Sequence, residues 1–345
     1  MKLKKWHIWL GFAISAVFLY LAFRKVDFSQ VWTYLTHAQW SWVLLGLVFY
    51  FIGVWLRAFR WQILLNPLKK LPISRLFQVV AIGYMGNNVY PARAGELLRA
   101  VLLKQKDQIS ISASLATIVV ERLFDALVIM GLVLLNLSQL TALPSAQSYI
   151  GAIRAVATWG AVIFLALFAL FLALVLFPQP TQKALDWAIN HLVIARLRKG
   201  LSDFITRFIE GLSSLRSAGE TLKVLLFSIA IWTCETGLYW GVMQAMGIHL
   251  SFMTLMLING VVNLVLLIPA APGGLGTFDA AGKAMLEVFG IASELALGYT
   301  LLLRVALWVP ITALGAVLFV REGFSLTTDM SKLQTEYADT SHEQV

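Results

Sequence analysis

Long apolar runs dominate the 345-residue chain, and short polar or basic segments separate them. An apolar run of about 18 residues or more is long enough to cross the hydrocarbon core of a bilayer as an α-helix. The pattern therefore predicts an all-α, polytopic membrane protein with six full spans. These predicted spans cover residues 6–23, 40–58, 112–137, 151–177, 222–246 and 295–320.

Two further apolar segments, residues 73–103 and 252–289, are each interrupted near the middle by proline and glycine. Such an interruption frees backbone polar groups that lipid cannot satisfy, so the segment must be enclosed by protein. We expect each segment to form a re-entrant hairpin, which enters the membrane and returns to the same side. The residues expected at the two breaks are Pro91, Gly95, Pro272, Gly273, Gly274 and Gly276.

The two broken segments share features that indicate an internal repeat. Pro91 and Pro272 each begin a Pro-x-x-x-Gly pattern, and the offset between them nearly equals the offset between Arg122 and Arg304. The spans between the two units would place them in opposite orientations. Inverted repeats of this kind build many secondary transporters, whose substrate sites lie near the membrane midplane where broken helices meet.

The same pattern divides the chain into five parts. Residues 178–221 are too charged to cross a membrane and carry apolar residues at helical spacing, which predicts two amphipathic helices on the cytoplasmic face. The five predicted parts are the N-terminal spans (1–72), repeat unit A (73–177), the amphipathic helices (178–221), repeat unit B (222–321) and a polar cytoplasmic tail (322–345).

Composition and charge agree with a membrane protein. Hydrophobic residues make up 59% of the chain, charged residues only 13%, and the mean hydropathy is +0.78, far above the range of soluble domains. Most lysines and arginines can be assigned to one side, with Arg57, Arg60 and Arg99 in cytoplasmic loops. This bias predicts a plasma (bacterial inner) membrane protein with both termini in the cytoplasm. It also accounts for the net charge of +9 without nucleic-acid binding.

Metal and redox chemistry find little support in the sequence. The single cysteine, Cys234, excludes an internal disulfide, and the five histidines are scattered without metal-ligand spacing. We therefore expect no metal site and no cofactor. The oligomeric state stays open, and a homo-oligomer is one of the alternatives.

Arginines at membrane depth are the first candidates for a binding site. Arg93 lies in the first break, and Arg122 and Arg304 lie in the spans that follow the two breaks. A guanidinium suits bidentate recognition of phosphate, and the helices that begin after the breaks would direct their positive N-terminal ends to the same place. We therefore expect the three arginines to line one cavity. Its other predicted members are Asn87, Asn88, Glu96, Glu121, Asp125, Asn263 and Thr277, and Thr277 is also expected to cap the second of these helices.

Glu121 and Asp125 allow two interpretations. They stand one helical turn apart with Arg122 three residues before Asp125, so they form the densest charged cluster inside an apolar run. The cluster either holds the first hairpin in place as a self-neutralising ion group or handles substrate and protons. Other ion pairs follow from spacing or from proximity of spans. The expected pairs are Glu96 with Arg99, Asp279 with Lys283, and Glu235 with Arg304.

Three segments carry a family resemblance: GYMGNNVYPARAGELLRAVLL, ATIVVERLFD and NLVLLIPAAPGGLGTFDAA. With them the chain resembles the flippase-like transmembrane family named after lysylphosphatidylglycerol synthase, the membrane part of the multiple peptide resistance factor. The resemblance covers both repeat units. It implies translocation of a lipid, with phospholipids and polyisoprenyl-phosphate lipids as candidate substrates. We expect no aminoacyl-transfer domain after the last span.

Two function classes follow from the sequence. One is a flippase that moves an anionic lipid headgroup through a polar cavity between inverted repeats, and the other is a membrane-embedded transferase or hydrolase of lipid phosphates. An enzyme needs a general base, a nucleophile or a metal site. The sequence offers no histidine cluster, no aspartate-rich metal motif and no Ser-His pair with suitable spacing, so it favours transport.

Overall fold

The computed structural model describes residues 6–24, 26–90, 94–141, 217–268 and 271–323, with scattered positions between 158 and 202. Within these ranges the chain is helical and contains no strand. The helices are α1 (Trp6–Phe23), α2 (Phe28–Thr36), α3 (Trp40–Leu65), α4 (Ile73–Val89), α5 (Gly95–Asp107), α6 (Ile111–Thr141), α10 (Ala218–Ala245), α11 (Phe252–Val265), the short 3₁₀ turn η4 (Pro272–Gly274), α12 (Thr277–Val288) and α13 (Ser293–Arg321).

The observed helices coincide with most of the predicted apolar segments. Three of them, α3, α10 and α13, are long and apolar enough to cross a membrane. α3 continues to Leu65, beyond the predicted end at residue 58. Several predicted parts lie outside the described residues. Most of the predicted span 151–177 and of the amphipathic helices 178–221 is among them. So are Pro91, Arg93 and the predicted tail, of which only residues 322 and 323 are described.

Helix α2 was not predicted, although its start carries a local signal. Asp27 is its N-cap and accepts hydrogen bonds from the amide of Ser29 at 2.9 Å and from the Ser29 hydroxyl at 2.7 Å. These bonds stabilise the carboxylate and hold the pKa of Asp27 below its ordinary value, with the hydroxyl contributing most. An aspartate before a short amphipathic stretch is thus the signal that length-based span assignment passes over.

α3 and α10 pack against each other in antiparallel orientation and form the most extensive helix–helix contact of the described residues. Glycines bring the two helices close together, because a Cβ atom at Gly241 would lie 2.6 Å from the carbonyl oxygen of Trp42 and 2.8 Å from the Cα of Gly46. Small residues at a helix interface permit this approach in membrane proteins, where lipid offers no hydrophobic drive for association.

α4 and α5 form the first helical hairpin. Lys69, just before α4, donates a hydrogen bond to the carbonyl oxygen of Asp107 at the end of α5 at 2.8 Å, so the open ends of the hairpin meet. Near the break the two backbones nearly touch, since a Cβ at Gly95 would lie 1.9 Å from the carbonyl oxygen of Gly83. The hairpin therefore requires glycine where α5 begins.

α11, η4 and α12 form the second hairpin. Leu257, near the start of α11, packs with Met285 and Phe289 at the end of α12, so this segment also folds back on itself. The connection takes positive φ angles at Gly273 (66°), Gly274 (64°) and Gly276 (83°), a region that L-residues with a Cβ rarely adopt. The predicted break at these glycines is therefore present in the backbone.

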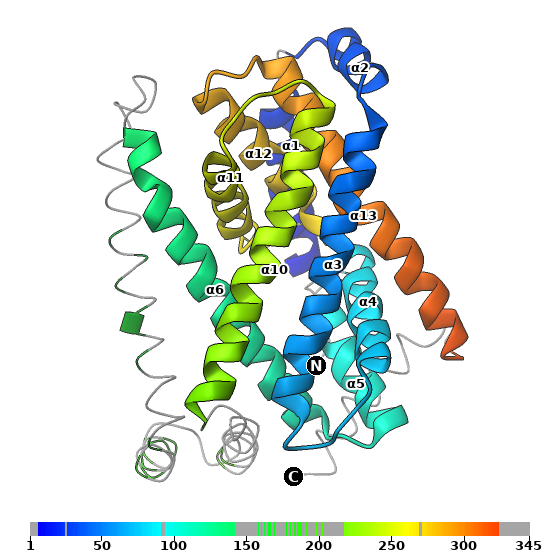
Figure 1. The fold of residues 1–345 in the computed structure, drawn as a ribbon, viewed down its shortest axis with the longest axis vertical. Coiled ribbons are helices and arrows are strands. Elements are labelled where there is room, and N and C mark those ends of the chain that lie inside the picture. Colours follow the sequence, from blue (N-terminus) through cyan, green and yellow to red (C-terminus); the bar gives the residue numbers. More distant parts are fainter. Residues whose placement is uncertain are drawn as a thin grey trace.

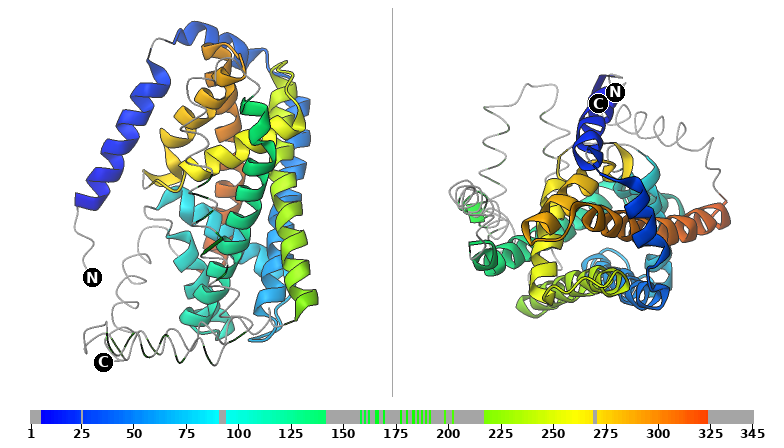
Figure 2. Two further views of the ribbon diagram at one scale, coloured as in Figure 1. Left: turned by 90° about the vertical axis from the view of Figure 1, so that its left-hand side faces the viewer. Right: turned by 90° about the horizontal axis from the view of Figure 1, so that it is seen from above.

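The two hairpins approach each other from opposite ends of the bundle. In Figure 1, α4 and α5 occupy the lower half and α11 and α12 the upper half, while α3, α6, α10 and α13 run through both halves. The side view in Figure 2 shows the same arrangement, with α1 packed beside the upper hairpin. The tips meet near the middle, where α4 contacts η4.

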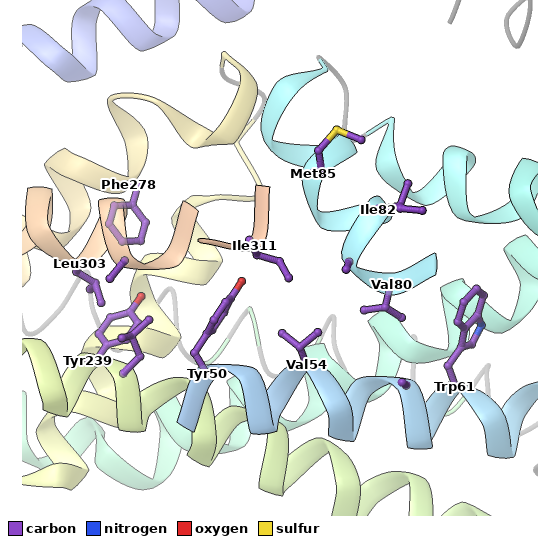
Figure 3. Close-up of a cluster of buried hydrophobic side chains, with 14 of the residues drawn as sticks. Tyr50, Val54, Trp61, Val80, Ile82, Met85, Tyr239, Phe278, Leu303 and Ile311 are labelled. Carbon is purple, nitrogen blue, oxygen red and sulfur yellow. The ribbon is translucent and has the colours of Figure 1, made fainter. Parts of the chain in front are cut away.

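Apolar side chains fill the interior and also cover the outside. Figure 3 shows buried residues from α3, α4, α10, α12 and α13, among them Val54, Val80 and Ile311. Outward-facing residues of α3 recur at helical spacing, as Leu44, Val48 and Ile52 do, and Val305 and Val309 of α13 are similarly exposed. An outer surface of this kind suits a lipid environment.

Candidate functional site

A cavity of about 160 Å³ lies where the end of α4 meets the second break and α13. Its wall combines aromatic rings, amides and two charged side chains. The lining residues are Tyr50, Tyr84, Asn88, Glu235, Tyr239, Asn263, Leu266, Gly273, Phe278, Arg304, Leu307 and Trp308. Both hairpins contribute to it, because Asn88 stands at the tip of the first and Gly273 at the tip of the second.

Arg304 of α13 is the positive charge of the cavity wall. Its Nη2 contacts Oδ2 of Asp279 at 2.7 Å and donates to the carbonyl oxygen of Gly274 at 3.1 Å. The guanidinium also lies over the Phe278 ring, 5.3 Å from its centroid. One edge of the guanidinium is thereby fixed to the second hairpin, and the side chain is only 12% exposed.

Several donors of the cavity wall have no hydrogen-bond partner within the described part of the chain. They are Nε and Nη1 of Arg304, Nε1 of Trp308 and the hydroxyl of Tyr239, and all four atoms are buried. An unpaired buried donor costs about 1–3 kcal/mol, so a convergence of such groups is unusual unless a ligand or water satisfies them. In Figure 3 the Tyr239 ring lies beside that of Tyr50, between α10 and Phe278.

The asparagines near the two breaks bond to backbone and side-chain groups beside the breaks. Asn87 accepts a hydrogen bond from the amide of Gly95 at 3.0 Å and so satisfies a backbone donor freed by the first break. Asn88 bridges to the Thr312 hydroxyl of α13 at 2.8 Å, and Asn263 bonds to Asn259 within α11. Asn88 and Asn263 line the cavity.

Thr277 does not cap α12, contrary to the sequence-based expectation. Its hydroxyl donates to the carbonyl oxygen of Gly274 at 3.0 Å, and it is the first residue of the helix. The N-cap residue is Gly276, and the carboxylate of Asp279, at the third position of the helix, accepts the amide of Gly276 at 3.0 Å. An acidic group therefore already compensates the positive end of this helix.

A second group of charges forms a buried ion network between α3, α5, α6 and α10. At its centre is Arg60, which is 0% exposed and contacts Asp125 at 2.5 Å and Glu121 at 3.4 Å. The hydroxyl of Ser228 accepts a further bond from Arg60 at 2.7 Å, and the indole of Trp232 donates to Asp125 at 3.2 Å. The two carboxylates are therefore bridged by an arginine.

Two more arginines complete the ion network. Arg99 contacts Glu121 at 2.7 Å and stacks on Trp61, with 3.8 Å between the guanidinium carbon and the ring centroid. Arg122 contacts Asp125 at 3.3 Å, as its spacing predicts, and Glu96 at 3.7 Å. We call Arg60, Glu96, Arg99, Glu121, Arg122 and Asp125 the ion network; its formal charges cancel.

Arg57 connects α3 to α10 through Glu235, with 2.5 Å between Nη2 and Oε2. Its guanidinium also lies 5.5 Å from the centre of the Tyr84 ring. Glu235 and Tyr84 both line the cavity. Arg57 therefore contacts two residues of the cavity wall without lining the cavity itself.

Three expected pairings are wrong. The expected pairs were Glu235 with Arg304, Glu96 with Arg99, and Asp279 with Lys283. The observed pairs are Glu235 with Arg57, Arg304 with Asp279, Lys283 with Glu287, and the contacts of the ion network. The assignment of Arg57, Arg60 and Arg99 to cytoplasmic loops is also wrong, because all three are buried within helices.

The sequence predicted that Arg93, Arg122 and Arg304 line one cavity. Of these arginines, Arg304 lines the cavity described here. Arg122, Glu121 and Asp125 do not line it and lie in the ion network, and Arg93 is outside the described residues. A role of these residues toward substrate stays a prediction. The structure also brings in Glu235, which the sequence named only as a partner of Arg304, and three tyrosines, which the sequence did not single out because their shared position depends on helix packing. The cavity tyrosines are Tyr50, Tyr84 and Tyr239.

Both hairpins place an acid and an arginine in the same relation. Glu96 and Asp279 stand in the first turn of the helix after each break, and each pairs with an arginine of the next long helix. The partners are Arg122 at 3.7 Å and Arg304 at 2.7 Å. The likeness of the two arginines noted in the sequence thus extends to their carboxylate partners.

Apolar helices of spanning length and charge pairs enclosed between them define an α-helical integral membrane protein. The family model described as the lysylphosphatidylglycerol synthase TM region matches residues 8–315, and the chain belongs to this family.

Similar curated proteins come from archaea. A UPF0104 membrane protein of Methanothermobacter thermautotrophicus is 26% identical over 320 residues, covering 89% of this chain and 91% of that protein. Glycosyltransferase AglD of Haloferax volcanii is 24% identical and is matched over 96% of this chain but only 57% of its own length. A UPF0104 membrane protein of Pyrococcus horikoshii is 24% identical, covering 81% of this chain and 86% of that protein.

Proposed function

We propose that this protein is a lipid flippase that moves an anionic phosphate-bearing headgroup, of a phospholipid or a polyisoprenyl-phosphate lipid, across the membrane. The cavity between the two hairpins is the proposed passage for the headgroup. The observation that carries this proposal is the convergence of buried donors from Arg304, Trp308 and Tyr239 on a cavity between opposed hairpins. Preformed donors of this kind suit a phosphate, and a guanidinium can bind it through two parallel bonds.

The proposed architecture has six membrane spans and two re-entrant hairpins arranged as inverted repeats. Opposite approach of the two hairpins and the matching Glu96–Arg122 and Asp279–Arg304 pairs support it. Discontinuous helices that meet at mid-membrane build the substrate sites of many transporters. We retain the proposed units 73–177 and 222–321, flanked by 1–72, 178–221 and 322–345.

The proposed binding residues follow from the sequence and from the cavity. Residues retained from the sequence are Asn87, Asn88, Arg93, Glu96, Glu121, Arg122, Asp125, Asn263, Thr277 and Arg304. Of these, Asn88, Asn263 and Arg304 line the cavity, and Tyr239 and Trp308 are added to them.

We propose a plasma-membrane location in which the end of the bundle with the α3–α4 connection faces the cytoplasm. Lysines gather at this end, including Lys69 and Lys70. Lys70→Cys, in a Cys234→Ala background, should react with an impermeant maleimide only from the cytoplasmic side. Gln30→Cys, near the exposed start of α2 at the other end, should react only from outside. The opposite labelling pattern would invert the topology.

Reconstitution tests the proposed activity directly. Vesicles that contain the purified protein and a phospholipid labelled on its acyl chain, with an unmodified headgroup, should expose the inner-leaflet label to an impermeant quencher faster than protein-free vesicles do. A polyisoprenyl phosphate carrying a label should be tested in parallel, because both lipids present a phosphate. Rates equal to those of protein-free vesicles for every phosphate lipid tested would contradict the flippase proposal.

The same vesicles distinguish transport from enzymatic conversion. A flippase leaves the chemical composition of the vesicle lipids unchanged, whereas a transferase or hydrolase produces a new lipid species. Mass spectrometry of extracted lipids after incubation therefore separates the two classes. A product that accumulates with time, in amounts exceeding the protein, would favour the enzyme.

A further inference from the structure

The charges around the cavity balance. Arg304 and Glu235 are the two charged residues in its lining, and each is paired with a residue outside the lining. Asp279 neutralises Arg304 at 2.7 Å, and Arg57 neutralises Glu235 at 2.5 Å. A ligand with net negative charge would therefore enter a low-dielectric site without a compensating charge, which is costly. A zwitterion adds no net charge.

The cavity wall offers two different chemistries. One consists of the unpaired donors of Arg304, Trp308 and Tyr239, which suit phosphate oxygens. The other consists of the Glu235 carboxylate with the rings of Tyr50 and Tyr84, which suit an ammonium group. Carboxylates accept hydrogen bonds from ammonium groups, and aromatic faces attract cations.

These two chemistries lie within reach of one small ligand. Glu235 and Tyr239 stand four residues apart on α10, so they project from the same face one turn apart. An engineered cavity of similar size, about 150 Å³, holds a benzene molecule, so this site has room for a headgroup fragment on the order of ten non-hydrogen atoms. A phosphate joined to a short amine fits this limit, whereas an additional sugar or a long amino-acid side chain exceeds it.

We propose that the cavity selects a zwitterionic phospholipid headgroup of the phosphoethanolamine type. The donors of Arg304, Trp308 and Tyr239 bind the phosphate, and Glu235 with the tyrosine rings binds the ammonium group. This inference rests on the proposed lipid-translocating function and narrows its phosphate-bearing headgroup to one in which an amine offsets the negative charge of the phosphate. Glu235, rather than Glu121 or Asp125, is then the acid that meets the cationic part of the lipid.

Ligand-dependent thermal unfolding of the purified protein in detergent tests the headgroup preference. Binding to the folded state raises Tm by an amount that grows with the logarithm of the ligand concentration divided by Kd. The probes are a short-chain phosphatidylethanolamine, a short-chain phosphatidylglycerol, free phosphoethanolamine and inorganic phosphate. We expect the phosphatidylethanolamine to give the same rise in Tm at about tenfold lower concentration than the phosphatidylglycerol. Free phosphoethanolamine that protects as well as the lipid would identify a soluble ligand and overturn the lipid assignment.

Substitutions in the cavity wall identify the side chain that binds the ammonium group. Glu235→Gln should abolish the tenfold preference while binding of phosphatidylglycerol persists, and Tyr84→Leu, which keeps the Arg57–Glu235 pair, should reduce it. Glu220→Gln, which alters an exposed pair with Lys223, serves as the control and should keep the preference. Because the ratio is measured within each variant, a change in stability does not affect it. If Glu235→Gln does not fold, Tyr84→Leu decides.

Failure of this inference is distinguishable from failure of the proposed function. Equal or tighter binding of phosphatidylglycerol by the wild-type protein, together with protein-dependent translocation in vesicles, would overturn the zwitterion proposal and leave the flippase standing. Absence of translocation for every phosphate lipid would overturn the function itself.

Discussion

Arg60→Ala is expected to lower the free energy of unfolding by about 3–5 kcal/mol, the largest stability effect among the charged residues that the structure describes. Arg60 is fully buried and is the common partner of Asp125 and Glu121. Its removal leaves the ion network with one uncompensated negative charge in a low dielectric, because Arg99 and Arg122 then face three carboxylates, and it removes the hydrogen bonds that Arg60 donates. Unfolding in mixed micelles with increasing dodecyl sulfate, followed by circular dichroism, measures the loss.

Two comparisons make the Arg60 result specific. Adding Asp125→Asn to Arg60→Ala should recover part of the lost stability, because it removes the negative charge that Arg60 no longer compensates. Lys223→Ala breaks an exposed pair with Glu220, in which the lysine side chain is 59% exposed, and should cost about 0–1 kcal/mol. If Arg60→Ala unfolded within about 1 kcal/mol of wild type, the ion network would not be what holds α3 to α6.

Arg304→Ala is expected to slow lipid translocation by about 10- to 100-fold while the protein remains folded. The change removes two unpaired donors from the cavity wall and leaves Asp279 without its cation. Arg304→Lys keeps the charge but lacks the planar fork, so its rate should fall between those of wild type and Arg304→Ala. Initial quenching rates in reconstituted vesicles, at matched protein content, give the comparison.

Matched variants on other helices locate the site. Arg321→Ala, at the exposed end of α13, should keep the wild-type rate because it lies far along the helix from the cavity. Arg122→Ala disturbs the ion network without touching the cavity lining. A greater loss from Arg122→Ala than from Arg304→Ala, with both proteins folded, would move the headgroup site to the ion network.

Much of the helical framework follows from local sequence. Length and apolarity locate α3, α10 and α13, and proline with glycine locates both hairpin breaks. These are local properties, because a run of apolar residues and a residue that tolerates positive φ act through their own backbone. The extension of α3 to Leu65 was missed because two arginines interrupt the run, and burial of a charge depends on partners elsewhere.

The partners of the charged residues could not be predicted in the same way. Arg57 and Glu235 are 178 residues apart in the chain, and Arg60 and Asp125 are 65 apart. Spacing within one helix pointed to Glu96 with Arg99 and Asp279 with Lys283, but each acid has an arginine of the following long helix closer at hand. Among the charged pairs that the sequence pointed to by spacing within one helix, Arg122 with Asp125 is the one that the described part of the chain shows in contact.

The sequence by itself therefore determined the membrane environment, most of the long apolar helices and the position of the two breaks, because each is fixed by composition and backbone preference within a single segment. Only the tertiary structure decided which charges neutralise one another and which polar groups reach the cavity. The physical reason is that a guanidinium in low dielectric pairs with whichever carboxylate the packed helices bring within about 3 Å, whatever its distance along the chain. The same packing set Arg304, Trp308, Tyr239 and Glu235 around one space.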